Sequence, residues 1–553
     1  MIKYNSENRI LILLVFFISL GLLLWGRFFY LSVIRHDYYL AKAKILIANN
    51  NNVAPRGSIF LTDKDSLPYA ASLNKEFPLI YAIPQKIKDP NVLAEKLSPI
   101  LELDKGDLFQ KLSKENDPYE ILKKRVSEET VKAIKAQKEV GLGVEDETLR
   151  YYPEGLYLSH AIGFLGFDKD GQAGQYGLEE YYNKELSGFI GSADLILTVD
   201  LAIQSQAGSL LLKTIHDWDA DGGSIVVMDP KDGSIFAMAS FPDFDANNYS
   251  SVTNPDFFTN PVTLKRYEPG SVFKPITMAI GIETGVVTPE TEYYNTGTVA
   301  VGNRVISNSI PDKVLGLQTM VKVLEQSLNT GAVFVEQKVP KDVFLKYLKN
   351  FGIDSKTDID VPEINGDLSV LGNMRDINFA TASFGQGIAM TPIELIRALS
   401  AIANGGKLIR PRMVKEIVSH GENNYNMPDG GKNYSVKQII SPETSAKLIN
   451  MMIKVVENGS GRRAGVSGYT IAGKTGTAQV PDLKNGGYLD QYIHTFVGFA
   501  PAYDPKFIAL IKLDNPKGVQ FAESTVVPVF SDLAKFIFSY LEIPPDKPTK
   551  ADQ

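Results

Sequence analysis

The chain has 553 residues, more than one core needs, and its 44% hydrophobic and 22% charged residues are typical of a folded, multidomain protein. A net charge of −7 without a dominant block of Lys and Arg argues against nucleic acid as a partner. The absence of cysteine excludes disulfides, thiolate catalysis and Cys-ligated metal sites.

The first predicted element is a membrane anchor over residues 10–31. Residues 10–26 carry no charge, and as a helix the whole segment spans about 33 Å, enough to cross the apolar core of a bilayer. Arg27 and Trp25 suit the interface at its end. A cleaved signal peptide is the alternative, but it has a shorter apolar region and a small-residue cleavage site. Residues 1–9 form a short tail, and the charges on the two sides do not set the orientation.

Residues 35–192 are predicted to form the next domain, which mixes short extended pieces with charged helical stretches. Within residues 92–114 the apolar positions recur at spacings of three and four, which predicts amphipathic helices packed on one face. The small residues of Ser187–Asp194 precede a sharp change of pattern. We therefore place a domain boundary there.

Residues 193–541 are predicted to form an α+β domain with an antiparallel sheet. A strand leads into a long helix within residues 194–215, and two strands joined by a turn at Asp229–Gly233 follow. Later elements are strands at 469–480, 494–499 and from Lys506, and a closing helix at 530–541. Strands at both ends with helices between them indicate the α+β class. Residues 542–553 are Pro-rich and charged, which predicts a disordered tail.

Ser271 and Lys274 are the candidate nucleophile and base. Pro269-Gly270 forms a turn before them, so Ser271 is expected at a helix N-terminus with Lys274 on the same helical face. A serine hydroxyl needs a base, and a lysine whose pKa is lowered by desolvation can act as one. The pattern S-x-x-K is weak by itself, because Ser72–Lys75 also matches it. We interpret that second match as surface chain, since no turn precedes it.

Ser327-Leu328-Asn329 interrupts a helical apolar pattern and is the second candidate element. A hydroxyl and an amide two residues apart at a junction between helices can point into one cleft, relay a proton and hold a substrate amide. The alternative is a simple cap and turn, since Ser and Asn favour both.

The third element, at residues 474–477, admits two interpretations. Residues 468–475 match the phosphate-binding pattern G-x-x-x-x-G-K-[ST], but that site needs a buried strand before it and a helix after it, and the flanking residues favour neither. Residues 469–480 instead predict a strand that presents Lys474 and two threonines, with Gly476 letting another chain approach the backbone. Such an edge strand would suit a peptide with a terminal carboxylate. An ordinary exposed strand is the plainer alternative.

The three elements occur in one domain in the order S-x-x-K, S-x-N, K-T-G, the motif set of penicillin-binding proteins and serine β-lactamases. Further similarity lies in PRGSIF at 55–60, GQYGLEEYYNKELSG at 174–188, SFGQGIAMTP at 383–392 and GYTIAGKTGTAQ at 468–479. The chain thus resembles a class B penicillin-binding protein, a monofunctional peptidoglycan D,D-transpeptidase. An anchor, an elongated pedestal domain (here 35–192) and a C-terminal penicillin-binding/serine β-lactamase-like transpeptidase domain are that family's layout.

The resemblance implies that Ser271 attacks the penultimate D-alanyl carbonyl of a stem peptide ending in D-Ala-D-Ala, with Lys274 as general base. An amine of a neighbouring stem peptide would then resolve the acyl-enzyme and leave a cross-link. β-Lactams would acylate the same serine, and no metal or organic cofactor is implied. The other implied site residues are Ser327 and Asn329, which relay protons and position the substrate; Lys474, Thr475, Gly476 and Thr477, which hold the terminal carboxylate; and the backbone amides of Ser271 and Thr477, which form the oxyanion hole.

The same resemblance implies a single-pass protein of the bacterial cytoplasmic membrane, with its catalytic domain on the outer face and residues 1–9 in the cytoplasm. No segment resembles a peptidoglycan glycosyltransferase, so a separate membrane glycosyltransferase is the expected polymerase, bound through the pedestal. The sequence LTDKDSLPYA after PRGSIF departs from the family's more usual Asp-Arg-Asn-Gly.

Three alternatives remain. A β-lactam sensor or β-lactamase-like hydrolase would use the same three motifs. A non-catalytic scaffold for a cell-wall polymerase would be expected to lack Ser271, Lys274 or Lys474, and all are present. A Ser-His-Asp hydrolase is disfavoured because no G-x-S-x-G occurs, and we interpret His160 and His494 as structural.

Overall fold

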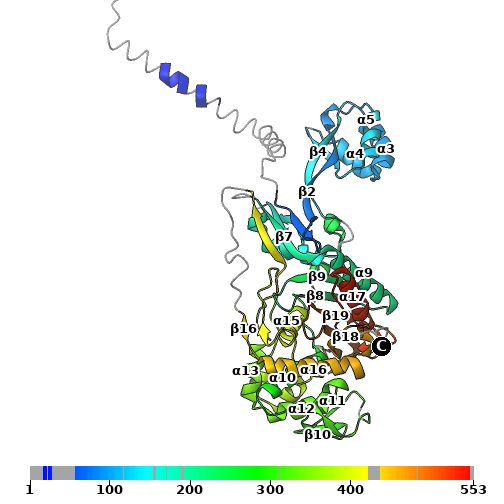
Figure 1. Cartoon of the computed structure of the whole chain (residues 1–553). Helices are drawn as coiled ribbons and strands as arrows, with labels where there is room; N and C mark the ends of the chain where they lie inside the picture. Colours follow the sequence, from blue (N-terminus) through cyan, green and yellow to red (C-terminus); the bar gives the residue numbers. More distant parts are fainter. Residues whose placement is uncertain are drawn as a thin grey trace, which may run out of the picture. The chain divides into compact units, whose positions relative to one another are not determined.

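The computed structural model describes residues 16–21, 23–25, 27, 56–115, 117–153, 157–169, 171–187, 192–310, 312–420, 436–482 and 484–547. The chain divides into two compact units. The small unit contains Asn74–Leu149, and the large unit consists of Arg56–Leu73 and Arg150–Gln553 (Figure 1). The limits of these two compact units differ from the domain limits predicted at 35–192 and 193–541. Those domain limits remain predictions from the sequence.

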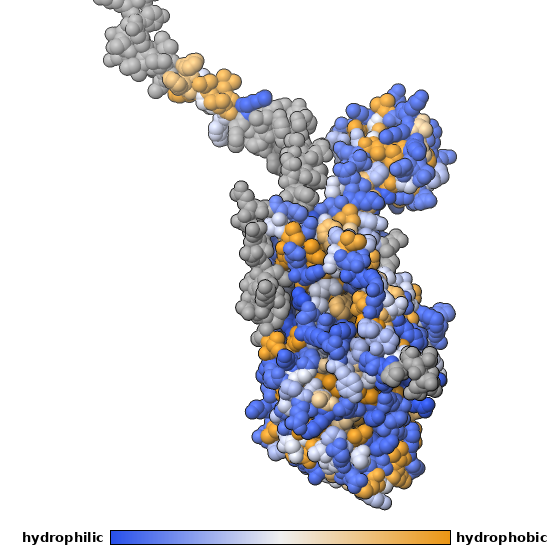
Figure 2. All heavy atoms as spheres, in the orientation of Figure 1, coloured by the Kyte–Doolittle hydropathy of each residue, from blue (hydrophilic) through white to orange (hydrophobic). Residues whose placement is uncertain are grey.

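Most of the predicted anchor at residues 10–31, and the tail at 1–9, lie outside the described residues. Residues 16–21 and 23–25 of this segment are helical, and Figure 2 shows them as mostly hydrophobic. Over the described part of the chain, no helix is both long enough and apolar enough to cross a membrane.

The small unit packs short helices on one another and against strands. Its helices are α3 (Pro90–Leu101), α4 (Lys105–Leu112) and α5 (Glu128–Ala136), and its strands are the second part of β2 (Pro68–Ala82), β3 (Glu120–Lys123) and most of β4 (Leu142–Tyr151). The side chains of Asp89, Asp104 and Ser127 cap the N-termini of the three helices by accepting hydrogen bonds from backbone amides. Leu97 of α3 and Leu108 of α4 are fully buried in one core, which confirms the amphipathic helices predicted within 92–114.

In the large unit, one sheet has the strand order β15-β7-β1-β2. Its strands are β15 (Val414–Ser419), β7 (Ala193–Asp200), β1 (Ile59–Thr62) and the first part of β2. Strand β1 runs parallel to β7 and antiparallel to β2, so it is hydrogen-bonded along both edges. Because β7 follows the boundary expected near Ser192 and β1 precedes it, residues from both sides of that boundary share one core.

The second sheet of the large unit is antiparallel throughout and has the order β17-β18-β19-β8-β9. Its strands are β8 (Gly222–Met228), β9 (Ile235–Phe241), β17 (Ala472–Pro481), β18 (Tyr488–Ala500) and β19 (Phe507–Asp514). The turn between β8 and β9 includes Gly233, whose φ of 78° is in the left-handed region that favours glycine. The predicted α+β class and antiparallel sheet are confirmed.

Helices cover both faces of this sheet (Figure 1). On one face lie α9 (Leu201–Asp217) and α17 (Val526–Tyr540), and on the other α15 (Pro392–Ala403) with α10 (Lys274–Glu283) behind it. Around them lie α11 (Met320–Glu325), α12 (Asn329–Lys338), α13 (Lys341–Asn350), α14 (Asp376–Ala382) and α16 (Pro442–Asn458). The rest comprises α6 (Ser159–Ile162), α7 (Gly177–Tyr181), α8 (Asn183–Leu186), and the strand pairs β5–β6 (Phe164–Asp168, Gly171–Gln175), β10–β13 (Glu292–Asn295, Gly316–Thr319), β11–β12 (Thr298–Val301, Arg304–Ser307) and β14–β16 (Lys407–Leu408, Lys437–Gln438).

Two segments differ from the sequence predictions. Ser72, in the second S-x-x-K match, is not surface chain: it lies fully buried in β2, and its hydroxyl donates to Glu179 Oε1 at 3.1 Å. Residues 542–547 were expected in a disordered tail, yet Ile543 is buried and Asp546 accepts the backbone amide of Thr470 at 2.7 Å. The remaining tail, residues 548–553, lies outside the described residues.

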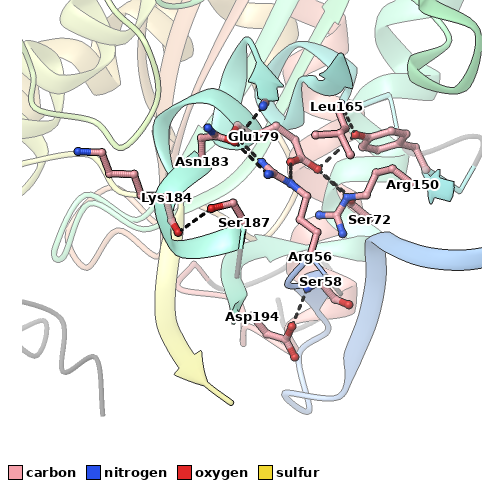
Figure 3. A network of polar contacts seen from close by, with 12 residues as sticks. Arg56, Ser58, Ser72, Arg150, Leu165, Glu179, Asn183, Lys184, Ser187 and Asp194 are labelled. Atoms are coloured by element: carbon pink, nitrogen blue, oxygen red, sulfur yellow. Dashed lines mark hydrogen bonds and ion pairs between the residues drawn. The ribbon is translucent and has the colours of Figure 1, made fainter. Parts of the chain in front are cut away.

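A buried ionic network surrounds Glu179 (Figure 3). Its carboxylate accepts hydrogen bonds from Arg56 Nε at 2.7 Å and Arg150 Nε at 2.8 Å, and also from Ser72 and Tyr152. Burial alone would raise the pKa of Glu179, but the two arginines hold that pKa below its usual value. The carboxylate is therefore ionised and ties the PRGSIF segment to the GLEEYYN segment.

Candidate active site

Ser271 lies on a 3₁₀ turn, η5 (Gly270–Phe273), which leads directly into α10. The helix N-terminus expected here is thus wound more tightly than an α-helix. In a 3₁₀ turn the side chains at i and i+3 eclipse, so Lys274 stands beside Ser271. The distance from Lys274 Nζ to Ser271 Oγ is 3.0 Å.

Lys274 is almost completely buried, with 1% of its surface exposed. Its Nζ lies 2.6 Å from the backbone oxygen of Ser327 and 3.2 Å from Ser327 Oγ. Burial, together with the nearby charge of Lys474, lowers the pKa of Lys274 well below its usual 10.5. An amine with so lowered a pKa can accept a proton near neutral pH.

Ser327 connects α11 to α12 and has a φ of 58°, which is uncommon for a residue other than glycine. Its Oγ lies between the two lysines, 3.2 Å from Lys274 Nζ and 3.0 Å from Lys474 Nζ. Backbone strain of this kind persists only where the surroundings enforce it. Asn329 is placed differently: it begins α12, and its Nδ2 donates to the backbone oxygen of Ser307 at 2.9 Å.

Strand β17 carries Lys474 and the two threonines, and it is an edge strand of its sheet as predicted. Residues 472–481 are extended throughout, so the phosphate-binding-loop alternative is wrong. Lys474 is fully buried rather than exposed, and its Nζ turns toward Ser327 Oγ and the backbone oxygen of Thr475, at 3.0 and 2.9 Å. Burial lowers the pKa of Lys474 to about 7, although the nearby Glu523 opposes this shift.

Gly476 allows β17 to approach the turn that holds Ser271. A Cβ at Gly476 would overlap Val272 Cγ1 and would lie 3.0 Å from the backbone oxygen of Pro269. The chain that approaches the backbone at Gly476 is therefore this turn of the protein itself.

A pocket of about 160 Å³ lies over these groups. Of the predicted site residues, Ser271, Ser327, Thr475 and Thr477 line it, whereas Lys274, Asn329, Lys474 and Gly476 do not. Larger cavities of about 350 and 360 Å³ occur elsewhere in the large unit and contain none of the predicted residues. Within the described residues, no group of three or more His, Asp or Glu side chains could hold a metal ion.

The structure adds residues to the pocket that the motifs did not indicate, among them Ser460 after α16 and Glu523 after β19. The polar, glycine-rich segment around Ser460 stands just before the strand with Lys474, which is the signal that could have pointed to it. Glu523 has no comparable signal in its sequence surroundings.

His494 supports one wall of this pocket from behind. It pairs with Thr477 across β17 and β18, and its ring nitrogens lie 2.8 Å from Thr525 Oγ1 and 3.1 Å from the backbone oxygen of Gln520. In the loop that contains Gln520, the backbone amide of Ala522 donates a hydrogen bond to Thr477 Oγ1 at 3.2 Å. Burial lowers the pKa of His494 to about 4, so the ring is neutral and its position is structural.

Two family models match the chain. Residues 223–535 match the penicillin binding protein transpeptidase domain, and residues 51–203 match the penicillin-binding protein dimerisation domain. Stage V sporulation protein D of Bacillus subtilis is 32% identical over 574 residues, which cover 98% of this chain and 87% of that protein. A peptidoglycan D,D-transpeptidase FtsI homolog of Mesostigma viride is 28% identical, covering 99% of this chain and 98% of that protein.

Solved structures agree with these matches. Penicillin binding protein 3 of Mycobacterium tuberculosis, in its apo form, is 28% identical with a TM-score of 0.65 over 73% of this chain and 93% of its own. The same protein complexed with aztreonam has a TM-score of 0.68 over 90% of this chain and 98% of its own, and at 24% identity it supports the fold alone. The transpeptidase model covers more than half of the 553 residues. The resemblance inferred from the motifs is confirmed, and the chain belongs to the penicillin-binding protein transpeptidase family, among the class B proteins.

Proposed function

We propose that this protein is a peptidoglycan D,D-transpeptidase that cross-links stem peptides through an acyl-enzyme on Ser271. One observation carries the assignment of roles. Hydroxyls and amines of the motifs follow one another in a line of contacts, the catalytic line. Lys274 Nζ is 3.0 Å from Ser271 Oγ and 3.2 Å from Ser327 Oγ, and Ser327 Oγ is 3.0 Å from Lys474 Nζ. Such a line of alternating hydroxyls and amines can activate a nucleophile and return its proton.

In the acylation step, Ser271 Oγ attacks the penultimate D-alanyl carbonyl while Lys274 accepts the hydroxyl proton. The backbone amides of Ser271 and Thr477 would stabilise the oxyanion of the tetrahedral intermediate. A proton passes through Ser327 to the departing nitrogen, the carbon–nitrogen bond breaks, and D-alanine leaves. The product is an ester between the donor peptide and Ser271.

In the second step, the amine of a neighbouring stem peptide attacks this ester. The amine loses a proton to Lys274, the new amide bond forms as the ester bond to Ser271 breaks, and Ser271 leaves with that proton returned from Lys274. The cross-link is then complete, and the enzyme is restored.

Donor binding is assigned to β17. Lys474, Thr475 and Thr477 would hold the terminal carboxylate, and Gly476 keeps this strand close to Ser271. Asn329 would accept a substrate N–H with its Oδ1, since its Nδ2 already donates to Ser307.

The predicted anchor and the family resemblance support a proposal for the location and for the partner. Residues 10–31 would anchor the protein in the bacterial cytoplasmic membrane, with the transpeptidase domain on the outer face, where peptidoglycan is built. A membrane glycosyltransferase bound to the pedestal would supply the glycan strands. β-Lactams would act as inhibitors by acylating Ser271.

The test is intact-mass spectrometry of the full-length protein after exposure to a fluorescent penicillin. The wild type should gain one adduct per chain, Ser271→Ala none, and Ser72→Ala, in the other S-x-x-K match, should keep it. Hydrolysis of the drug without a lasting adduct would favour a β-lactamase-like hydrolase. Neither adduct nor hydrolysis would favour a non-catalytic scaffold.

Gly476→Ala is expected to lower the rate of acylation by penicillin about 100-fold, because a misplacement on the order of 1 Å in a reacting site has an effect of that size. The added methyl group would overlap Val272 and push β17 away from the Ser271 turn. Gly372→Ala is the control, since no atom lies within 4 Å of the added Cβ there. Val272→Ala in the same chain should restore part of the rate, and a double variant as slow as the single would contradict this explanation.

A further inference from the structure

Ser460 lies in the active-site pocket but belongs to none of the three motifs. Its Oγ is 2.6 Å from Thr475 Oγ1, a short distance for two hydroxyls, so one of them donates to the other. Thr475 is one of the residues assigned to the donor carboxylate. Ser460 therefore contacts the strand to which donor binding is assigned.

The turn that carries Ser460 is held rigidly. The amides of Gly459 and Gly461 both donate to the backbone oxygen of Val455, at 3.1 Å each, which closes the end of α16. A Cβ at Gly459 would overlap the backbone oxygen of Glu325, so this turn packs directly on the end of α11. Since Glu325 lies two residues before Ser327, the position of Ser460 is fixed relative to the catalytic line.

Ser460 also extends that line. Thr475 Oγ1 is 3.4 Å from Lys474 Nζ, which is 3.0 Å from Ser327 Oγ. Hydroxyls and amines thus follow one another without a break from Ser460 to Ser271, and both residues line the pocket. Either Ser460 or Thr475 could donate the hydrogen bond between them. Which of them donates decides whether the Thr475 hydroxyl can donate to a ligand.

A hydroxyl has one hydrogen to donate. If Thr475 donated to Ser460, its hydrogen would point away from the ligand and its oxygen would repel a carboxylate. If Ser460 donates, the Thr475 hydrogen is left for the ligand. An anionic ligand favours the second arrangement, because a hydrogen bond to a charged acceptor is the stronger one.

We propose that Ser460 is a positioning residue for the donor's terminal carboxylate: its hydroxyl donates to Thr475 Oγ1 and thereby directs the Thr475 hydroxyl hydrogen at that carboxylate. This inference rests on the proposed function. It assigns to a fourth segment, the turn after α16, a share in recognising the D-alanyl end of the donor, and in recognising the carboxylate of a penicillin.

The test compares second-order acylation rate constants of the full-length protein with benzylpenicillin. Ser460→Ala should lower the constant by up to about tenfold, the upper end of the effect of one lost hydrogen bond, because Ser460 no longer directs the Thr475 hydroxyl at the carboxylate. Ser460→Thr keeps a hydroxyl, so its acylation rate constant should stay within about twofold of that of the wild type. In a Thr475→Ala background, Ser460→Ala should change the constant by less than about twofold, since the two residues act through one hydroxyl.

The methyl ester of benzylpenicillin provides a second comparison, because it lacks the anionic carboxylate. With this ester, Ser460→Ala and the wild type should react at similar rates. Ser460→Cys, nearly the same size as serine but a weak donor, covers the case in which the alanine variant does not fold, and it should be slowed in the same direction.

Failure of the proposed function and failure of the inference about Ser460 would give different results. If the wild type forms no adduct at Ser271, the proposed function itself fails. If the wild type reacts but Ser460→Ala is as fast, the inference is overturned. It is equally overturned if Ser460→Ala slows the acid and the ester alike, or slows Thr475→Ala as much as the wild type, since a merely structural role would have those effects.

Discussion

Lys274→Met is expected to lower the rate at which penicillin acylates Ser271 by about 1000-fold, within the range that general-base catalysis contributes. The lysine amine is 3.0 Å from Ser271 Oγ, and burial has lowered its pKa so that it can accept the hydroxyl proton. Methionine fills a similar volume without an amine, so the loss would reflect the missing base. Stopped-flow fluorescence with a labelled penicillin measures the rate.

Two further variants separate the base from the charge and from the sequence pattern. Lys274→Arg keeps a cation that stays protonated, so it should be about as slow as Lys274→Met. Lys75→Met alters the other S-x-x-K match, where the lysine is exposed on β2, and should leave the rate unchanged. An arginine variant that reacts at nearly the wild-type rate would show that Lys274 acts through its charge and would remove its role as base.

Glu179→Gln is expected to reduce the free energy of unfolding of the large unit by about 3–5 kcal/mol, the range found when one partner of a buried ion pair is removed. Glutamine keeps the shape of the side chain but removes the negative charge that lies between Arg56 and Arg150. Both guanidinium groups would then share a buried site without that charge. Urea unfolding followed by tryptophan fluorescence and circular dichroism measures the change.

The neighbouring Glu180→Gln serves as the control. Its carboxylate is exposed and accepts the backbone amide of Tyr176 at 3.0 Å, so the change in stability should stay below about 1 kcal/mol. Equal effects of the two substitutions would contradict the importance assigned to the buried network. A stabilising effect of Glu179→Gln would show that desolvation of the carboxylate outweighs its attraction to the arginines.

Local patterns sufficed for much of the site. The turn before Ser271, its spacing from Lys274 and the extended pattern around Lys474 each depend on neighbours in the sequence, and the structure has all three. The burial of Lys474 was not predictable in this way, because the groups that enclose it come from segments far along the chain. Ser460 was missed for the same reason: its contact with Thr475 depends on how α16 ends against α11.

The fold shows the same division. Strands β8 and β9 were predicted from the apolar residues on either side of the turn at Asp229–Gly233, and they are almost wholly buried, whereas the helix α9 buries one face. Ser72 was misjudged, because its burial depends on Glu179, which is 107 residues away in the chain. The short strands β10 to β13 have four residues each, too few for a period to stand out.

Strand β1 has a mechanical consequence for a protein that would be held at its N-terminal end. A tensile load on the chain ahead of Arg56 acts on a strand that is bonded on both edges, to β2 and to β7. To extract it, the load must shear two ladders at once and pull Arg56 away from Glu179, whereas an edge strand would give way one bond at a time. The large unit can therefore bear force at the point where the chain enters it.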